Sequence, residues 1–280
     1  MILIADAGST KTSWALINKN DIVQLETGGI NPVWMSDEKM TEPIETMSSE
    51  NFHPSKIFFF GAGCLGNENS QRVKKLISNS WPTAEISVQS DMIGACIATC
   101  GDSQGLVFIL GTGSNSCYWN GEEIVSQAGS GGYLLGDEGS GSAMGKILLR
   151  NVIRRKLNND IIVEFEKEFQ LNKENIIGKV YTHESPAAFL ASFTRFIKKN
   201  LLEPDIANIP REAFILLYQE HIDYYLKNNI QFSSVHFIGS VAHYFQEQLI
   251  EVFSPLCVPL HIEQRPIESL INYYQKKFKL

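Results

Sequence analysis

The first residues of the chain set the strongest limit on how it can fold. Ile2 to Ala5 is an unbroken apolar run, Asp6 ends it, and Gly8-Ser9-Thr10-Lys11-Thr12 follows as a turn of small and hydroxyl-bearing residues. Ser13 to Ile17 is then patterned as a second strand. The stretch predicts two strands joined by a tight turn.

The composition of this turn suits an anion. Small residues let a ligand approach the backbone N–H groups, and the hydroxyls of Ser9, Thr10 and Thr12 add donors. Each hydrogen bond to a charged oxygen contributes about 1.5–3 kcal/mol. A carboxylate such as Asp6 cannot bind phosphate directly, but it can hold a hydrated magnesium ion. The turn alone fits an ordinary polar surface hairpin equally well.

The same arrangement occurs a second time. Leu106 to Leu110 is another buried strand, Gly111-Thr112-Gly113-Ser114 is a turn of glycines and hydroxyls, and Asn115 to Trp119 is patterned as the returning strand. Asn120-Gly121, a strong hairpin signal, joins it to a strand expected over Glu122 to Val125. The copies share a pattern and little sequence identity. They predict two domains of one design, with a boundary near residue 100.

The other segments alternate between strands and helices, which predicts a mixed sheet of the α/β class. A helix starting near Ser36 is expected to be divided at Pro43, because proline lacks the N–H that a helix interior needs. Further strands are expected over Asp21–Leu25, Ile57–Phe60, Ile86–Val88 and Val235–Ile238 and near Cys257–Ile262. Helices are expected over Asn69–Ser80 and Met92–Thr99, from Ser140 onward, and over Ile161–Phe169, Pro186–Leu202, Pro210–Leu226, Val241–Phe253 and Ile267–Lys279, with breaks near Pro204 and Pro210.

Composition excludes several classes of function. A net charge of −7 argues against a nucleic-acid-binding surface, which would be basic. No apolar run is long enough to cross a membrane, and the N-terminus lacks the basic leader of a signal peptide. The five scattered cysteines, Cys64, Cys96, Cys100, Cys117 and Cys257, fit reduced thiols in a cytoplasmic protein. Cys96 and Cys100 would share a helix face, and we interpret them as small core residues rather than a metal or redox pair.

Asp91 is the best candidate for a catalytic base. It follows a strand at the edge where ligands of open α/β sheets bind, and it begins a helix. A general base in reach of an acceptor hydroxyl contributes about 10²–10⁴-fold to the rate. Asp is also a favoured N-cap residue, so a purely structural role is the alternative.

Two more glycine-rich segments have less specific patterns. Gly61-Ala62-Gly63-Cys64-Leu65-Gly66 fits the dinucleotide fingerprint, but the ribose-binding acid is missing from the end of the next strand, so we favour a plain strand-to-helix turn. Gly129 to Gly141 is too dense in glycine for a packed element. Its two acids, Asp137 and Glu138, suggest a loop that offers carboxylates to ligand hydroxyls, and a flexible surface loop is the equal alternative.

Together these segments resemble the N-acetylglucosamine kinase and BadF/BadG/BcrA/BcrD ATPase family, a branch of the actin-like ATPase and sugar kinase superfamily. Asp6 to Thr12 resembles the first phosphate loop, Leu110 to Asn115 the second, and Ile238-Gly239-Ser240-Val241 the adenosine motif. Gly136-Asp137-Glu138-Gly139-Ser140 completes a specific combination, and the likeness spans nearly the whole chain.

The resemblance implies an α/β fold of two ribonuclease-H-like (actin-like ATPase) domains around an ATP and sugar cleft. One domain would be residues 1–100 joined by the C-terminal helix 267–280, and the other residues 101–266 with a helical insertion. ATP and Mg²⁺ are the implied cofactors, and a homodimer is the implied assembly. The implied reaction is phosphorylation of N-acetylglucosamine or glucosamine to its 6-phosphate.

The resemblance also assigns roles by position. Asp91 is implied as the base and Asp6 as the residue that positions magnesium. Implied contacts to ATP are Gly8, Ser9, Thr10, Lys11, Thr12, Gly111, Thr112, Gly113, Gly239 and Ser240, and implied contacts to the sugar are Asn31, Asp91, Ser114, Asn115 and Asp137.

Two positions depart from the family pattern, and two other functions stay open. Gly131 stands where such kinases carry a tryptophan beside the sugar, and Pro266-Ile267-Glu268-Ser269-Leu270 lacks a glycine-alanine pair. An ATPase activator of a dehydratase would need an iron–sulfur cluster held by cysteines. A non-catalytic sensor would bind sugar or nucleotide without turnover.

Overall fold

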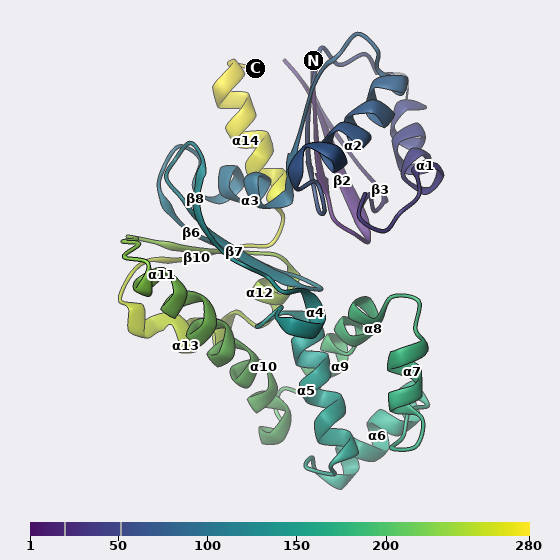
Figure 1. The fold of residues 1–280 in the computed structure, drawn as a ribbon, viewed down its shortest axis with the longest axis vertical. Coiled ribbons are helices and arrows are strands. Elements are labelled where there is room, and N and C mark those ends of the chain that lie inside the picture. The colour runs from purple at the N-terminus through teal and green to yellow at the C-terminus, as the bar shows by residue number, and fades with distance from the viewer. Residues whose placement is uncertain (20, 51) are drawn as a thin grey trace. The chain divides into compact units, whose positions relative to one another are not determined.

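The computed structural model describes residues 1–19, 21–50 and 52–280. They form two compact units (Figure 1). The first comprises residues 1–103, 120–124 and 265–280, and the second comprises residues 104–119 and 125–264. The chain first passes between the units after Ser103, beside the point where the strand pattern of the sequence restarts.

The first unit is built on a five-stranded sheet in the order β3-β2-β1-β4-β5. Its strands are β1 (Ile2–Ala7), β2 (Lys11–Asn18), β3 (Asp21–Gly28), β4 (Lys56–Gly61) and β5 (Glu85–Ser90). β1 pairs with β2 in antiparallel and with β4 in parallel orientation, and β5 extends the parallel part. The predicted strand, turn and strand at the N-terminus and the predicted mixed sheet are confirmed.

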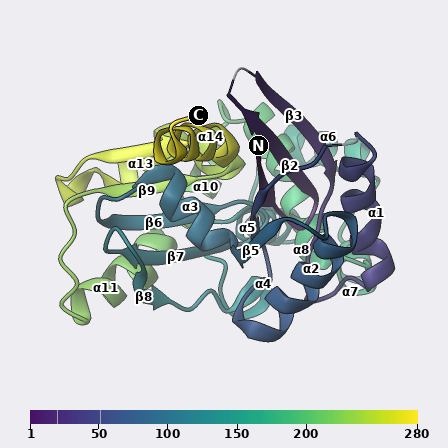
Figure 2. The same ribbon diagram turned by 90° about the horizontal axis from the view of Figure 1, so that it is seen from above.

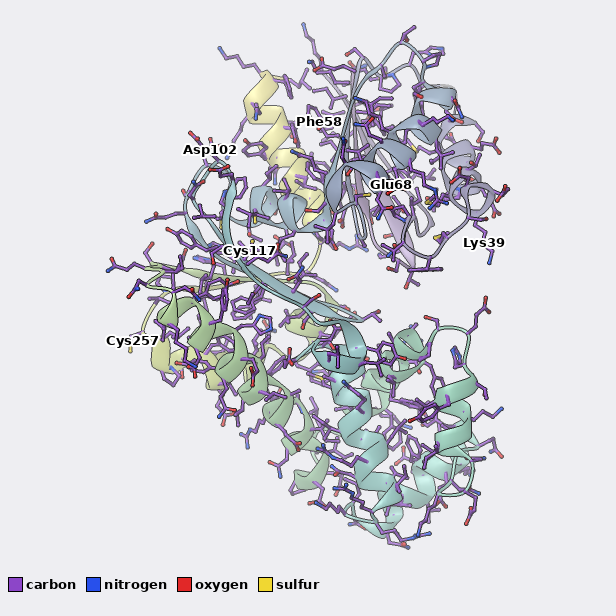
Figure 3. All side chains as sticks on the ribbon, viewed as in Figure 1. Lys39, Phe58, Glu68, Asp102, Cys117 and Cys257 are labelled. Atoms are coloured by element: carbon purple, nitrogen blue, oxygen red, sulfur yellow. The ribbon has the colours of Figure 1, made fainter. Side chains whose placement is uncertain are left out.

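The apolar run of β1 reflects burial on both faces of this sheet. On one face Leu3 and Ala5 pack with α1 (Asp37–Ser48) and α2 (Gly66–Ser80). On the other, Ile2 and Ile4 pack with α3 (Asp91–Thr99) and α14 (Pro266–Phe278), which lie side by side (Figures 1 and 2). Phe58 on β4 points toward α14, where its ring stacks 4.3 Å from that of Tyr274 (Figure 3). A strand covered on both faces is apolar throughout.

Pro43 lies inside α1 and does not divide it, so that prediction was wrong. Proline removes one helical hydrogen bond. The helix persists because the Ser36 hydroxyl caps its first turn and because Met40, Ile44 and Met47 are fully buried. Tertiary burial therefore outweighs the local cost of the proline.

The second unit repeats the sheet. Its strands, β6 (Gly105–Leu110), β7 (Ser114–Trp119), β8 (Ile124–Ala128), β9 (Val235–Ile238) and β10 (Leu260–Glu263), have the order β10-β9-β6-β7-β8. That is the order of the first sheet taken from the opposite edge. β6 pairs with β7 in antiparallel and with β9 in parallel orientation, as β1 does with its neighbours. The duplicated design inferred from the two turns is confirmed.

The hairpin after β7 differs from the prediction. Glu122 and Glu123 belong to the turn, and β8 begins only at Ile124. Both glutamate N–H groups donate to the side-chain oxygen of Asn120 at 2.8 Å. The Asn120 side chain thus closes a longer loop than the two-residue turn that Asn-Gly suggests.

A helical insertion separates β8 from β9. It contains α4 (Gly132–Leu135), α5 (Gly141–Ile153), α6 (Asn159–Phe169), α7 (Ile176–Thr182), α8 (Pro186–Ser192), α9 (Thr194–Lys199), α10 (Pro204–Leu217), the π-helical turn η1 (Tyr218–Ile222) and α11 (Asp223–Lys227). After β9 come α12 (Ser240–Tyr244), α13 (Gln246–Phe253) and the 3-10 turn η2 (Ser254–Leu256). Phe193 and Phe196 are buried in the core of this unit. Neither α7 nor α4, which lies within the glycine-rich segment, was expected from the sequence.

Several predicted boundaries within this region were wrong. The helix expected over 186–202 divides after Ser192, where the Thr194 hydroxyl donates to the Ala191 carbonyl at 2.7 Å and competes with the helical bond. The helix expected over 241–253 divides at Phe245, whose φ of −115° and ψ of 28° leave the helical region. The strand expected near 257–262 is β10.

α10 shows how burial overrides local signals. It starts at Pro204, where a missing N–H costs nothing, and it continues through Pro210, which was expected to break it. Ile206, Ala213 and Phe214 bury the same helix into the core. The buried face keeps the helix intact past the proline.

Two expectations from composition can be compared with the structure. Within residues 1–19, 21–50 and 52–280, no helix has both the length and the apolar character that a membrane span requires. Cys96 is a buried core residue, as predicted, whereas Cys100 at the end of α3 is only partly buried. Cys117 is buried and Cys257 is exposed (Figure 3).

Candidate functional site

The first glycine turn is held by its own backbone and by the loop that follows β3. The Gly8 N–H donates to the Lys11 carbonyl at 2.9 Å, and the Gly29 N–H donates to the Thr10 carbonyl at 3.1 Å. A Cβ on Gly29 would stand 2.4 Å from the Ser9 carbonyl, so only glycine allows this close approach. The turn is therefore a fixed structure with Ser9 and Thr10 exposed at its tip.

Asn31 joins this turn to the end of β4. Its side-chain amide donates to the Ser9 hydroxyl at 2.8 Å, and its side-chain oxygen accepts the Val33 N–H at 3.0 Å. A Cβ on Gly63 would lie 2.4 Å from that oxygen. The segment over residues 61–66 is a strand-to-helix turn between β4 and α2, as favoured from the sequence. Gly63 in this turn leaves room for the side-chain amide of Asn31.

Lys11 points away from the tip of the turn. Its ammonium lies 2.8 Å from the Glu26 carboxylate across β2 and β3, and both side chains are more than half exposed. The charge of Lys11 still acts on the turn, because it lowers the pKa of Asp6.

Asp6 and Asp91 lie at the same edge of the first sheet. Asp6 ends the apolar run of β1, Asp91 follows β5, and the two strands flank β4 in parallel orientation. Burial and the charge of Asp91 raise the pKa of Asp6 to about 7, against the opposing effect of Lys11. Burial also raises the pKa of Asp91, although the Met92 N–H, which donates to it at 2.9 Å, acts in the opposite direction. The two carboxyl groups are therefore difficult to ionise at the same time.

The N-cap of α3 is Ser90 rather than Asp91. The Ser90 hydroxyl accepts the Ile93 N–H at 3.4 Å, and Asp91 is the first residue inside the helix. A capping role therefore does not account for Asp91, whose carboxylate accepts the adjacent Met92 N–H.

The acid pair fits a hydrated divalent cation. Among the described residues, no three side chains of the His, Cys, Asp or Glu type are grouped to hold a metal by themselves. Mg²⁺ does not need such a cage, since it keeps most of its waters and binds one or two carboxylates plus substrate phosphates. Repulsion between Asp6 and Asp91 is what a cation would relieve.

The second glycine turn is braced by the N-terminus of α5. The Gly111 N–H donates to the Gly113 carbonyl at 2.9 Å, and the Gly111 carbonyl accepts the Gly141 N–H at 2.9 Å. The Thr112 carbonyl accepts the Ser142 N–H at 3.0 Å. Two of the N–H groups that a helix start leaves unpaired are satisfied in this way.

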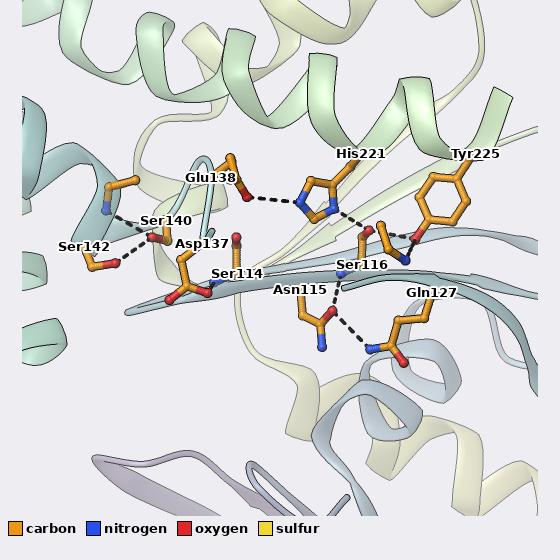
Figure 4. A network of polar contacts seen from close by, with 12 residues as sticks. Ser114, Asn115, Ser116, Gln127, Asp137, Glu138, Ser140, Ser142, His221 and Tyr225 are labelled. Atoms are coloured by element: carbon orange, nitrogen blue, oxygen red, sulfur yellow. Dashed lines mark hydrogen bonds and ion pairs between the residues drawn. The ribbon is translucent and has the colours of Figure 1, made fainter. Parts of the chain in front are cut away.

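Asp137 closes over this turn. Its carboxylate accepts the Ser114 N–H at 3.2 Å, and a Cβ on Gly113 would stand 2.7 Å from it (Figure 4). Burial raises the pKa of Asp137, while the Ser114 N–H and the charge of Lys146 oppose the rise. Asn115, next along β7, has its side-chain oxygen bonded to Gln127 at 3.1 Å. The structure thus brings the Asp137 carboxylate to the Ser114 N–H, and the Asn115 side chain projects from the opposite face of β7 to that of Ser114.

Gly239 lies beside the second turn. Its φ of 113° is left-handed, and a Cβ there would be 2.4 Å from the Leu110 carbonyl, directly before Gly111. Its N–H donates to the Glu263 carbonyl at 3.0 Å, and the exposed Ser240 begins α12. Only glycine permits β6 and the start of α12 to approach so closely.

Two buried hydroxyls have no hydrogen-bond partner among the described residues. They are Thr12 Oγ1 and Ser114 Oγ, and each belongs to the first residue that pairs after a glycine turn: Thr12 opposite Ala7, and Ser114 opposite Leu110. An unsatisfied buried hydroxyl costs about 1–3 kcal/mol, so a group that a ligand can satisfy is the natural explanation.

A buried polar chain behind the second turn was not foreseen from the sequence. It contains Ser116, His221, Tyr225 and Glu138, and Figure 4 shows it running from β7 through η1 to the glycine-rich segment. Ser116 and His221 are 105 residues apart, and nothing local marks either as polar and buried. Helical spacing could have placed His221 and Tyr225 on one face, which is the one signal that was available.

No family model matches the chain, but two other comparisons with known proteins found relatives of it. Over 120 residues the chain is 38% identical to N-acetyl-D-glucosamine kinase of Dictyostelium discoideum, a match that covers 40% of this chain and 37% of that protein. The chain thus matches little more than a third of that relative's length.

Solved structures extend the likeness to the whole chain. The crystal structure of a proposed N-acetylglucosamine kinase from Porphyromonas gingivalis is 32% identical, with a TM-score of 0.89, over 99% of this chain and 100% of that one. A proposed N-acetylglucosamine kinase from Chromobacterium violaceum (15% identity, TM-score 0.73, 97% and 98% covered) shares the fold. So does a ROK family glucokinase from Streptomyces griseus, solved with glucose and AMPPNP (14% identity, TM-score 0.59, 94% and 93% covered).

Proposed function

Because the chain belongs to the N-acetylglucosamine kinase family of sugar kinases, we propose that it transfers the γ-phosphoryl group of ATP to a hydroxyl of an aminosugar. N-acetylglucosamine, phosphorylated on its 6-hydroxyl, is the substrate that the relatives' names favour, and glucosamine is the second choice. The proposal includes Mg²⁺ dependence, a cytoplasmic location and a homodimer.

The observation that carries this proposal is the pair of Asp6 and Asp91 beside the first glycine turn. Phosphoryl transfer needs little covalent chemistry from the protein, and it depends on positioning and on stabilisation of charge. Two features supply these elements. One is a backbone turn held in a single shape by its own hydrogen bonds, and the other is two partly buried carboxylates at one sheet edge.

Asp91 is the proposed general base. It would accept the proton of the sugar hydroxyl as that oxygen attacks the γ-phosphorus. Burial raises the pKa of Asp91 toward the operating pH, which favours proton transfer. Its position on a helix start, fixed by the Ser90 cap, holds the carboxylate in one place.

Asp6 is the proposed residue that holds the hydrated magnesium ion of Mg-ATP. A magnesium ion bound there would neutralise part of the negative charge of the phosphates. Gly8 to Thr12 and Gly111 to Gly113 would donate N–H and O–H groups to phosphate oxygens, and Gly239 and Ser240 would bound the adenosine. Lys11 would act through its charge, since its ammonium is engaged by Glu26.

Asn31, Ser114, Asn115 and Asp137 are the proposed sugar contacts. Asn31 and Asp137 are each nine-tenths buried and held by neighbouring groups, so their polar atoms have fixed directions. Donors and acceptors with fixed directions select one orientation of the sugar hydroxyls better than mobile groups do.

A panel of acceptors tests the proposal. Purified protein with ATP and MgCl₂ is mixed with N-acetylglucosamine, glucosamine, N-acetylmannosamine, glucose or no sugar, and ADP and product mass are measured. We expect sugar-dependent ADP and a hexosamine phosphate, with the largest kcat/KM for N-acetylglucosamine. ADP release without a phosphorylated sugar would support an ATPase, and binding without turnover would support a sensor.

A further inference from the structure

The glycine-rich segment that carries Asp137 is attached to the second unit near both of its ends. Ala128, which precedes it, donates its N–H to the Tyr225 hydroxyl at 3.2 Å. At the other end Glu138 lies 3.5 Å from the Nε2 atom of His221. A Cβ on Gly139 would come within 2.8 Å of the Leu217 side chain, so the segment packs directly on the end of α10.

Ser116 links these two attachments. Its hydroxyl is 2.7 Å from the Tyr225 hydroxyl and 2.7 Å from the Nδ1 atom of His221 (Figure 4). Ser116 is fully buried and His221 is 2% exposed. The contacts therefore form one chain from Ala128 through Tyr225, Ser116 and His221 to Glu138, and it is buried except at Glu138, whose side chain is 16% exposed.

One set of hydrogen-bond directions gives every proton of the chain an acceptor. In it the Tyr225 oxygen accepts the Ala128 N–H, the Tyr225 hydroxyl donates to Ser116, and the Ser116 hydroxyl donates to Nδ1 of His221. A neutral His221 then carries its proton on Nε2 and directs it to Glu138. Burial lowers the pKa of His221 and raises that of Tyr225, which favours the neutral forms that this pattern needs.

The chain closes into a ring through Asp137. Ser114 and Ser116 lie two apart on β7 and so project to the same face. The Ser114 N–H donates to the Asp137 carboxylate, and the next residue, Glu138, contacts His221. The other ring nitrogen of His221 is bonded to the Ser116 hydroxyl, which completes the ring. His221 reaches both partners from η1, a π-helical turn, and such turns are frequent at functional sites.

Asp137 needs this support because its backbone is strained. Its φ of 60° is left-handed, a conformation that a residue other than glycine adopts at a cost of about 1–3 kcal/mol. Such a conformation persists only where the surrounding contacts determine it.

We propose that Glu138 and His221 are positioning residues, which hold the left-handed Asp137 so that its carboxylate is preset for the sugar. This inference rests on the proposed function, because it deepens the role of Asp137 in that site. It assigns to the contact between Glu138 and His221 an effect on sugar affinity and none on ATP affinity or on the chemical step.

Two substitutions at one position test this inference. His221→Asn puts an amide near the place of Nδ1, so it can bond Ser116 and cannot reach Glu138. His221→Gln puts an amide near the place of Nε2, so it can reach Glu138 and leaves Ser116 without its partner. Both are neutral and similar in size, so a loss of packing affects both. Glu138→Ala removes the acceptor itself, and Leu135→Ala, with a side chain that is 89% exposed in the same segment, is the control.

Steady-state kinetics with N-acetylglucosamine and with ATP give the readout. We expect His221→Asn and Glu138→Ala to raise the sugar KM roughly tenfold, about the effect of one lost hydrogen bond to a charged group, with kcat within twofold and the ATP KM unchanged. His221→Gln should stay within about threefold of the wild type. Equal sugar KM values for the two His221 variants, or a loss confined to kcat, would overturn the inference. No turnover by the wild type with any sugar would overturn the proposed function and this inference with it.

Discussion

The two glycine turns share a backbone and differ in their charge. In each, the glycine after the strand donates its N–H across the turn at 2.9 Å, Gly8 to Lys11 and Gly111 to Gly113, so the first turn is one residue longer. In each, a buried hydroxyl belongs to the first residue that pairs with the strand before the turn, Thr12 with Ala7 and Ser114 with Leu110. The penultimate residue of β1 is Asp6, and the residue at the same place in β6 is Ile109.

The difference shows that both units contain the glycine turn, whereas the acid next to the turn is present in the first unit alone. Donor turns follow from the strand, turn and strand design, which each unit needs for its sheet. The acid serves no such need, because burial and Asp91 raise the pKa of Asp6 to about 7 and so make its charge costly. A residue kept at a cost in one copy and replaced by isoleucine in the other is best explained by function.

The largest effect is expected from Asp91→Asn. The amide keeps the shape of the side chain, and its oxygen can still accept the Met92 N–H, but the base that accepts the sugar proton is gone. We expect kcat to fall by about 10²–10⁴-fold, with ATP and sugar still bound. Turnover measured by sugar-dependent ADP and binding measured by calorimetry separate the two quantities.

Asp160→Asn is the matched control for Asp91. Asp160 is also an acid in the first turn of a helix, α6, and it is exposed. Its loss should leave kcat within twofold. An undiminished rate in Asp91→Asn would show that another group takes the proton.

Asp6→Asn should have the next largest effect. Because the proposed role is to hold hydrated magnesium, we expect the Mg²⁺ concentration for half-maximal rate to rise by roughly 10–100-fold, the range seen when groups around a metal are removed. Titration with MgCl₂ at fixed ATP measures it. Ile109→Ala, at the same place in the other turn, should leave the Mg²⁺ requirement unchanged.

Asp6→Asn also predicts a pH dependence of stability. The folded pKa of about 7 lies above the ordinary value of 3.8, so the folded state binds more protons and wild-type stability falls as pH rises from 3.8 to 7. The asparagine variant lacks this loss. Without ATP or Mg²⁺, its melting temperature should therefore exceed that of the wild type by a margin that grows from pH 5 to pH 8. A constant margin would contradict the raised pKa.

The strands, turns and sheets of this molecule could be predicted from the sequence better than its polar contacts could. Strand, turn and strand patterns are local, and they identified both sheets, both turns and the placement of Asp6 and Asp91. Helix boundaries were missed where tertiary burial overrides a local signal, as at Pro43 and Pro210. The ring through Ser116 and His221 depends on a contact between distant segments, which no local pattern encodes.

The two unpartnered hydroxyls offer a smaller and more selective comparison. Thr12→Val and Ser114→Ala each remove a buried hydroxyl that has no partner among the described residues, so each should raise the stability of the ligand-free protein by about 1 kcal/mol. If ligands satisfy these groups, Thr12→Val should raise the ATP KM several-fold and Ser114→Ala the sugar KM. Thermal unfolding and kinetics test both. If both variants alter the same KM, the Thr12 hydroxyl does not serve ATP while the Ser114 hydroxyl serves the sugar.

The smallest effect concerns Gly131, which stands where the family resemblance of the sequence implies a tryptophan. Gly131 and Gly132 have nearly equal φ values of 66° and 65°, but a Cβ on Gly131 would stand 3.0 Å from the Leu135 carbonyl carbon, whereas nothing lies within 4 Å of one on Gly132. Both alanine variants should lose about 1–2 kcal/mol from the left-handed backbone. The crowding at residue 131 should add to this loss and raise the sugar KM slightly in Gly131→Ala alone, because the shift passes to Gly136 and Asp137. Equal stability and equal sugar KM in the two variants would mean that the backbone around residue 131 can shift at no cost. A tryptophan at residue 131 would then be compatible with this backbone.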